Sequence, residues 1–134
     1  MPKTIHHINI LVDDIEKASA SFSRFLDVDP IIESLPIRQA ISARFDCNGI
    51  WLVLVSPLTA LSPLTQIIGT RGEGVFLLSF ESTDIDADLE RLTRDSIAFS
   101  DSEKRKGADD WEVQDIRLPY CLDVVLQLCQ SISK

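Results

Sequence analysis

One face of a predicted sheet can collect polar side chains suited to ligand binding or proton transfer: His7, Asn9, Ser79, Glu81 and Gln127. His7 and Asn9 lie two positions apart, as do Ser79 and Glu81, and side chains two apart on a strand point to the same face. An imidazole and a carboxylate can transfer protons, which makes His7 and Glu81 the candidate catalytic residues. The amide and hydroxyl groups can only donate or accept hydrogen bonds, so they are candidates for orienting a ligand.

A purely structural role competes with each of these functional roles. His7 could be an interior histidine that is hydrogen-bonded to Asn9 or Gln127. Glu81 stands at the end of a strand, where a glutamate is usually solvated. Trp51 could stack on a planar ligand, or it could pack in the core or in a dimer interface. The residues leave these alternatives open.

The elements that would carry the polar side chains occur twice along the chain. The alternating run Ile5–Val12 predicts a strand, and Asp14 then caps a predicted helix. The apolar run Val75–Phe80 predicts a second strand, and Asp84 caps a second helix. The two capping aspartates are 70 positions apart, so a strand–helix unit repeats.

Each repeat continues into shorter predicted strands. Asn48-Gly49 predicts a hairpin in the first repeat, because both turn positions need positive φ. The first repeat has strands at 31–35, 37–46 and 50–56, and the second at 97–100, 111–118 and 124–130, with a solvated loop at 101–110. We therefore expect an α/β (α+β) fold in a single domain, residues 1–134, built of two βαβββ modules. Module one is 1–56, the joining segment is 57–73, and module two is 74–134.

Composition limits the partners. The chain has 134 residues, and its 13 basic and 21 acidic residues give a net charge of −8, which argues against nucleic acid or an anionic membrane as partner. No apolar run approaches the ~20 residues of a transmembrane helix, and no signal peptide is recognisable, so we expect a cytoplasmic protein. The three cysteines have no Cys-x-x-Cys spacing and are expected to be reduced.

Several short segments resemble the vicinal-oxygen-chelate superfamily, which includes glyoxalases, extradiol dioxygenases, and bleomycin or fosfomycin resistance proteins. They are His7-Ile8-x-Ile10, Asp14-Ile15-Glu16-Lys17-Ala18, Ser62-Pro63-Leu64 and Arg71-Gly72-Glu73-Gly74. The last two are most similar to the methylmalonyl-CoA epimerase branch. The resemblance implies a glyoxalase-like cup formed by the two modules, and a homodimer.

The resemblance also implies metal ligands at His7, Val53, Leu77 and Gln127, of which His7 matches and Gln127 is a poor donor. In the epimerases, a glutamate after a proline and a glutamate in the last strand are proposed as acid and base. Here these positions are Ile37 and Gln127, and an amide does not exchange a proton near neutrality. Most metal ligands are therefore missing, and we expect no metal and no other cofactor.

The alternation predicts a largely apolar inward surface with a few polar groups, as in small-molecule pockets. We expect the protein to bind a small, mostly apolar organic ligand. The alternatives are an isomerase or lyase of the methylmalonyl-CoA epimerase or glyoxalase type with a reorganised active site, and a fold kept for protein–protein contact.

No inward residue offers strong positive charge, so neutral or cationic ligands are expected in preference to acyl-CoA thioesters, unless Arg71 turns inward. The expected inward residues are His7, Asn9, Leu11, Trp51, Val53, Val55, Leu77, Ser79, Glu81, Val125, Gln127 and Cys129; those expected to bind the ligand are His7, Asn9, Trp51, Val53, Leu77, Ser79, Glu81 and Gln127.

Overall fold

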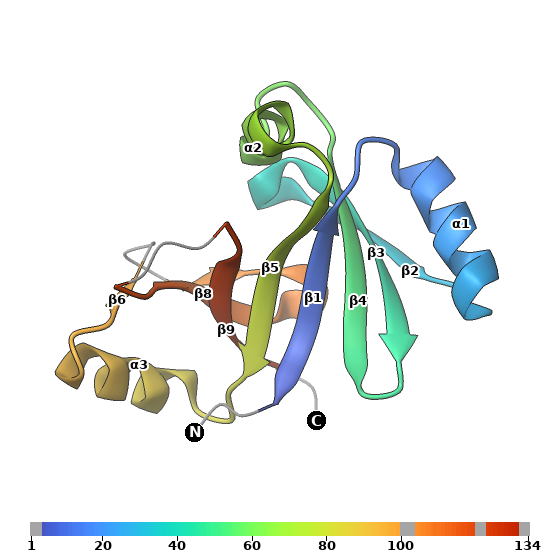
Figure 1. Cartoon of the computed structure of the whole chain (residues 1–134). Helices are drawn as coiled ribbons and strands as arrows, with labels where there is room; N and C mark the ends of the chain where they lie inside the picture. The colour runs from blue at the N-terminus through green and yellow to red at the C-terminus, as the bar shows by residue number, and fades with distance from the viewer. Residues whose placement is uncertain (1–3, 100–103, 120–122, 132–134) are drawn as a thin grey trace. The chain divides into compact units, whose positions relative to one another are not determined.

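The computed structural model describes residues 4–99, 104–119 and 123–131 (Figure 1). The strands are β1 (Ile5–Leu11), β2 (Ile31–Leu35), β3 (Ala40–Cys47), β4 (Ile50–Pro57), β5 (Gly74–Glu81), β6 (Ala98–Phe99), β7 (Arg105–Lys106), β8 (Glu112–Arg117) and β9 (Val125–Gln130). The helices are α1 (Ile15–Leu26), α2 (Pro63–Arg71) and α3 (Ile85–Arg94), with 3-10 turns η1 (Pro36–Arg38) and η2 (Ala108–Asp110). This order contains the βαβββ pattern twice, with β7 added in the second copy, and confirms the α+β fold class.

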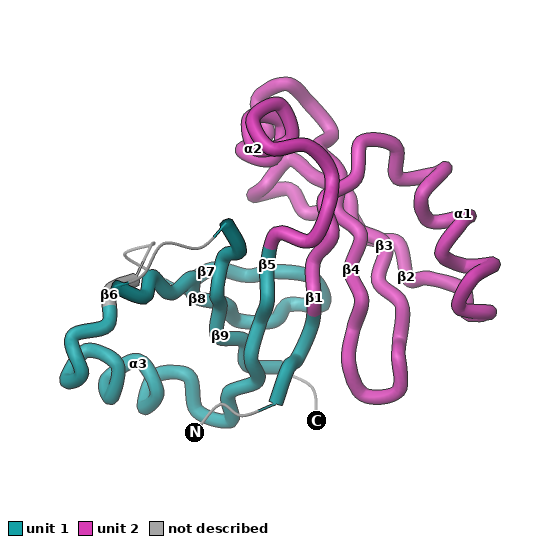
Figure 2. The backbone as a smooth tube through the Cα atoms, in the orientation of Figure 1, with its two compact units in different colours: residues 1–7, 77–134 teal, residues 8–76 magenta. Residues whose placement is uncertain are grey.

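Two compact units divide the described chain, as Figure 2 shows. Unit 1 contains residues 1–7 and 77–134, and unit 2 contains residues 8–76. The boundaries fall inside β1 and β5, so each of these strands contributes to both units. The units therefore divide the chain differently from the sequence repeat, because the first seven residues belong with the second module.

Unit 2 has the strand order β2-β3-β4-β1 and is covered on one face by α1. Asp14 caps α1, and its Oδ1 accepts a hydrogen bond from the Lys17 backbone nitrogen at 3.1 Å, as the sequence predicts. The Asn48-Gly49 hairpin is also confirmed, with φ values of 61° and 105° at the two positions. The packed apolar side chains are Ile10, Val12, Ile15, Ala18, Phe22, Leu26, Ala43, Phe45, Leu52 and Leu54.

Unit 1 has the strand order β1-β5-β9-β8-β6, and β7 pairs with β8. β9 is parallel to β5 and antiparallel to β8. Asp84 caps α3 by accepting a hydrogen bond from the Ala87 backbone nitrogen at 3.1 Å. Gln130 Oε1 accepts a hydrogen bond at 2.8 Å from the Ile85 backbone nitrogen, which ties α3 to one face of β9.

Two sequence-based boundaries are wrong. Pro36 begins the turn η1, and Gln39, which follows the turn, has a φ of 48°, so β3 starts at Ala40 and not at Ile37. The charged stretch 101–110 was expected to be a loop, but it contains β7 and the turn η2. Residues 100–103, and the part of the final hairpin at 120–122, lie outside the described residues. In the described part of the chain, no helix is long and apolar enough to cross a membrane.

Candidate functional site

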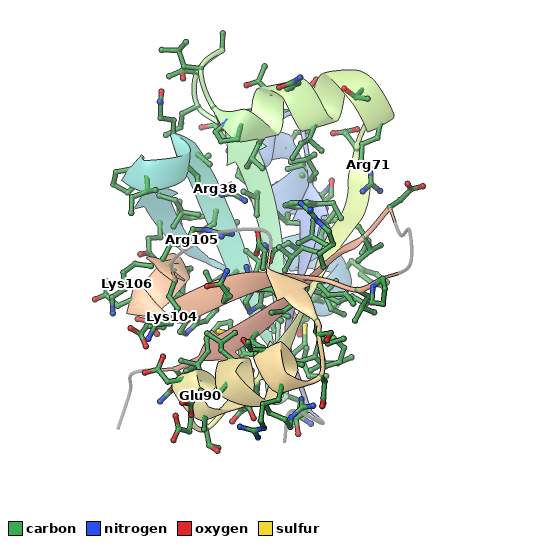
Figure 3. All side chains as sticks on the ribbon, turned by 90° about the vertical axis from the view of Figure 1, so that its left-hand side faces the viewer. Arg38, Arg71, Glu90, Lys104, Arg105 and Lys106 are labelled. Atoms are coloured by element: carbon green, nitrogen blue, oxygen red, sulfur yellow. The ribbon has the colours of Figure 1, made fainter. Side chains whose placement is uncertain are left out.

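A buried polar network lies in unit 1 on β8 and β9. Gln127 Nε2 donates a hydrogen bond to Asp115 Oδ1 at 3.0 Å, and the two residues are direct partners in the β8–β9 ladder. Arg105, which lies between Lys104 and Lys106 (Figure 3), donates to the same oxygen at 3.3 Å. Since side chains alternate along β9, Gln127 lies on the opposite face from Gln130, which is bonded to α3.

Both histidines of the chain are buried in unit 1 and contact each other. His6 Nδ1 and His7 Nδ1 are 2.8 Å apart, and His6 Nε2 is 2.8 Å from Ser131 Oγ. The ring of Trp111 packs against both imidazoles, with centroid distances of 4.5 Å to His6 and 4.8 Å to His7. One Nδ1 atom must donate and the other accept, which requires at least one ring to be neutral.

Burial keeps these groups uncharged. Desolvation, and secondarily the neighbouring His6, lowers the pKa of His7 to about 3, while Gln127 partly opposes the shift. Desolvation also lowers the pKa of His6, against the effect of Glu81. Burial raises the pKa of the Cys129 thiol to about 12, although Ser79 opposes this. The site therefore contains neutral imidazoles and a protonated thiol at physiological pH.

Two buried oxygens near this network have no hydrogen-bond partner among the described residues: Ser79 Oγ and Gln127 Oε1. Ser79 and Gln127 are direct partners in the β5–β9 ladder, so they lie side by side. The Gln127 amide is fixed, because its nitrogen must face the Asp115 carboxylate, and the oxygen is then left available as an acceptor.

The structure places the residues predicted from sequence in both units. In unit 1, the side chains of His7, Leu77, Ser79 and Gln127 are buried, whereas Glu81 is exposed. Glu81 lies opposite Cys129 in the β5–β9 ladder, and no hydrogen bond joins its side chain to His7 within the described residues. His7 has His6 as a hydrogen-bond partner at 2.8 Å, and Gln127, one of the two partners expected from the sequence, is close enough to His7 to oppose the lowering of its pKa.

In unit 2, Val53 is buried and Asn9 and Trp51 are half-buried. The guanidinium of Arg44 lies 5.2 Å from the centre of the Trp51 ring and forms a 2.6 Å ion pair with Glu33. One face of Trp51, which was a candidate for stacking on a ligand, is thus covered by Arg44.

Unit 2 also has an open depression of about 520 Å³ at the start of α1. None of the residues predicted to bind a ligand lines it. Its lining residues are Asp13, Asp14, Ile15, Glu16, Ile41, Ser56, Pro57 and Leu58.

Several charged and aromatic residues that contact the predicted site residues or their partners were not predicted from the sequence. They are His6, Arg105, Trp111 and Asp115 in unit 1, and Glu33 and Arg44 in unit 2. Asp115 had a detectable signal, because Trp111, Val113 and Asp115 alternate on one face of a predicted strand. Arg105 had none, since its neighbours are charged residues and a glycine. The expectation that the inward surface lacks a strong positive charge omitted Arg105, which the structure pairs with Asp115.

The residues at the positions of the implied metal ligands do not fit a divalent ion. Leu77 is a fully buried hydrocarbon side chain, and Val53 has no donor atom. His7 offers one imidazole nitrogen, and Gln127 offers only the weakly donating amide oxygen. A useful site needs three or more donors, and these positions supply at most two.

Comparison with known proteins places this arrangement in a family. The family model described as the glyoxalase/bleomycin resistance protein/dioxygenase superfamily matches residues 6–114. The uncharacterized protein YqjC of Bacillus subtilis (strain 168) is 24% identical over 127 residues, which cover 94% of this chain and 91% of that protein.

Solved structures share the fold. The hypothetical protein BH1468 from Bacillus halodurans C-125 has a TM-score of 0.90 at 20% identity, with 98% of this chain and 96% of that chain covered. A methylmalonyl-CoA epimerase in complex with methylmalonyl-CoA and NH4+ has a TM-score of 0.91 at 20% identity, with 99% and 97% covered. At these identities the similarity shows the fold alone.

Proposed function

This chain belongs to the glyoxalase/bleomycin resistance protein/dioxygenase superfamily, and we propose that it binds a small, mostly apolar organic ligand without the divalent metal that the family resemblance implies. The observation that carries the proposal is the pair of buried oxygens without partners, Ser79 Oγ and Gln127 Oε1, on adjacent strands. A buried polar group left without a hydrogen bond costs about 1–3 kcal/mol. A ligand that bonds to both atoms would remove that cost.

The two atoms specify the polar part of the ligand. Gln127 Oε1 can only accept, so the ligand must donate an N–H or O–H there. The Ser79 hydroxyl can donate to an acceptor on the same ligand. An adjacent donor and acceptor are found in carboxamides and lactams. Leu77 and Val125 lie on the same face by alternation and favour an apolar body.

The charges of the site favour an uncharged ligand. His7 is neutral, and Arg105 and Asp115 form an ion pair. An anion would therefore meet no unpaired positive group among these residues, and desolvating it would cost more than desolvating a neutral amide.

We also infer that the protein acts in the cytoplasm as a homodimer. The exposed side chains of Ile31, Ile32 and Ile37, on and just after β2, support a covered surface there.

A second candidate is an isomerase or lyase with a reorganised site, which Asp115 favours. Its carboxylate is buried on the same face as Ser79 and Gln127, and it is a better acid–base candidate than the exposed Glu81. The fold similarity to a methylmalonyl-CoA epimerase supports an acyl-CoA as the substrate of such an enzyme.

A thermal-shift screen distinguishes the two candidates. The probes are benzamide, benzylamine, benzoate, methylmalonyl-CoA and an S-acyl glutathione. A ligand at 100 times its Kd stabilises a protein by about 2.7 kcal/mol, a shift on the order of 5–15 °C for a domain of this size. We expect benzamide to raise Tm and benzoate to leave it unchanged. Stabilisation by methylmalonyl-CoA or the S-acyl glutathione, with no effect of benzamide, would replace the binding function with the enzymatic one.

A further inference from the structure

Three metal-binding side chains meet in unit 1: His6, His7 and Cys129. One ligand atom from each lies within 4.8 Å of the others, and the residues are only 6%, 3% and 0% exposed. We propose that these three side chains form a three-coordinate site for a soft monovalent ion, Cu(I). The site differs from the set implied by the family resemblance, since it shares only His7 with it, and it goes beyond the proposed function.

The hydrogen bonds around the two imidazoles suit metal binding. His6 can carry its proton on Nε2 and donate it to Ser131 Oγ, at 2.8 Å. His7 can carry its proton on the ring nitrogen remote from His6, with the partnerless Gln127 Oε1 as an acceptor nearby. Both Nδ1 lone pairs then face each other, and a cation can replace the proton now shared between them. Metal-bound histidines normally donate their other N–H in this way.

The required movement is small. With metal–nitrogen distances of about 2.0 Å, trigonal coordination separates the two nitrogens by about 3.5 Å. They are now 2.8 Å apart, so the rings must separate by about 0.7 Å. Trp111 packs on both rings and is itself buried, which keeps water from the nitrogens.

Charge and ligand type select the ion. On binding, the Cys129 thiol releases its proton to solvent and forms a metal–sulfur bond, with no change in oxidation state. Cu(I) and one thiolate sum to zero charge, whereas Zn²⁺ would leave one positive charge in a buried site, which is costly. Thiolate is also the ligand that selects soft ions such as Cu(I).

The test is an anaerobic titration of the full-length, reduced protein with Cu(I) in competition with the chromophoric chelator bathocuproine disulfonate. We expect one Cu(I) per chain, with affinity lowered at least about 100-fold in Cys129→Ser and in His6→Asn, because losing a ligand should cost more than losing an outer-shell partner. The matched controls are Cys47→Ser, in unit 2, and Cys121→Ser. Both should bind Cu(I) like the unaltered protein.

Three results would overturn the site: no Cu(I) bound in competition, binding that persists in Cys129→Ser, or binding lost in either control. A parallel titration with Zn²⁺ tests the choice of ion, since tighter binding of Zn²⁺ than of Cu(I) would contradict the charge argument. Circular dichroism checks the fold of each variant. If Cys129→Ser is unfolded, His6→Asn and His7→Asn decide the outcome in the same assay.

Discussion

Gln127 and Asp115 face each other across the β8–β9 ladder, and the amide nitrogen of Gln127 donates to the Asp115 carboxylate at 3.0 Å. Arg105 donates to the same carboxylate oxygen. Asp115 therefore fixes the orientation of the Gln127 amide and compensates the charge of Arg105. The position of the Gln127 oxygen therefore depends on this carboxylate.

Asp115→Asn should lower the free energy of unfolding by about 2–4 kcal/mol, because it removes the charge of one partner from the largely buried Arg105–Asp115 ion pair. Urea unfolding measures the change. The control is Asp95→Asn, which breaks the more exposed Arg91–Asp95 pair on α3 and should cost less than about 0.5 kcal/mol. Equal effects of the two substitutions would show that the Asp115 network does not stabilise the protein.

The protein should lose stability on mild acidification because of His7. Its pKa is about 3 in the folded state against 6.5 for an ordinary solvated histidine, so the unfolded chain binds the proton first as the pH falls. The contribution of neutral, buried His7 to the free energy of unfolding is therefore complete above pH 6.5 and is lost as the pH falls from 6.5 to 3. Between pH 7.5 and 5 we expect a loss of about 2 kcal/mol.

Urea unfolding of the unaltered protein and of His7→Gln, at both pH values, checks this expectation. His6 and His7 are the only histidines in the sequence, so the variant should lose less stability than the unaltered protein, and the lowered pKa of His6 accounts for the rest. A stability that is constant from pH 7.5 to 5 would mean that His7 accepts a proton in the folded protein.

The fold was predictable where local chemistry repeats. Asp14 and Asp84 each follow a strand and cap a helix, and both caps are present in the structure. The Asn48-Gly49 turn was also predictable from local chemistry, because positive φ at two successive positions suits few other residue pairs.

The candidate site was less predictable, because it depends on contacts between distant residues. Strand alternation places His6 and His7 on opposite faces, yet their rings contact each other and share Trp111, more than 100 positions away. Arg105 lies in a stretch whose composition is typical of a loop, and only its pairing with β8 brings it to Asp115.

The purified protein should contain no stoichiometric Zn, Co, Ni or Mn, because Leu77 and Val53 have no donor atom and Gln127 offers only a weak amide oxygen. Elemental analysis after mild purification measures this, and about one such ion per chain would contradict it. Leu77→His combined with Gln127→Glu adds two donors to His7 in unit 1, so the double variant should bind cobalt. A folded double variant that binds no cobalt at millimolar concentration would count against the placement of these positions.

The two sequence modules should not fold separately. Expressing Met1–Pro57 apart from Leu58–Lys134 removes β1 from unit 1, where the Thr4 carbonyl accepts a hydrogen bond from the Glu81 backbone nitrogen at 2.8 Å. Each half also buries too little apolar surface to be stable alone. Circular dichroism and thermal melting of the halves check this prediction. A monomeric half with a sharp thermal transition would disprove it.

Ser79→Ala should have opposite effects on stability and on binding. In the free protein the buried Ser79 hydroxyl has no partner within the described residues, so its removal should leave the free energy of unfolding unchanged or raise it by up to about 1 kcal/mol. In the complex the hydroxyl bonds to the ligand, so the variant should bind benzamide about 5-fold more weakly, which corresponds to about 1 kcal/mol.

The matched control is Ser82→Ala, because the Ser82 hydroxyl is also buried but donates to Asp88 at 2.5 Å. That control should lose about 1–3 kcal/mol of stability and bind benzamide normally. Urea unfolding and the thermal-shift titration measure the two quantities, and a Ser79→Ala protein that is destabilised as much as the control would show that Ser79 already has a partner and is not a ligand-binding group.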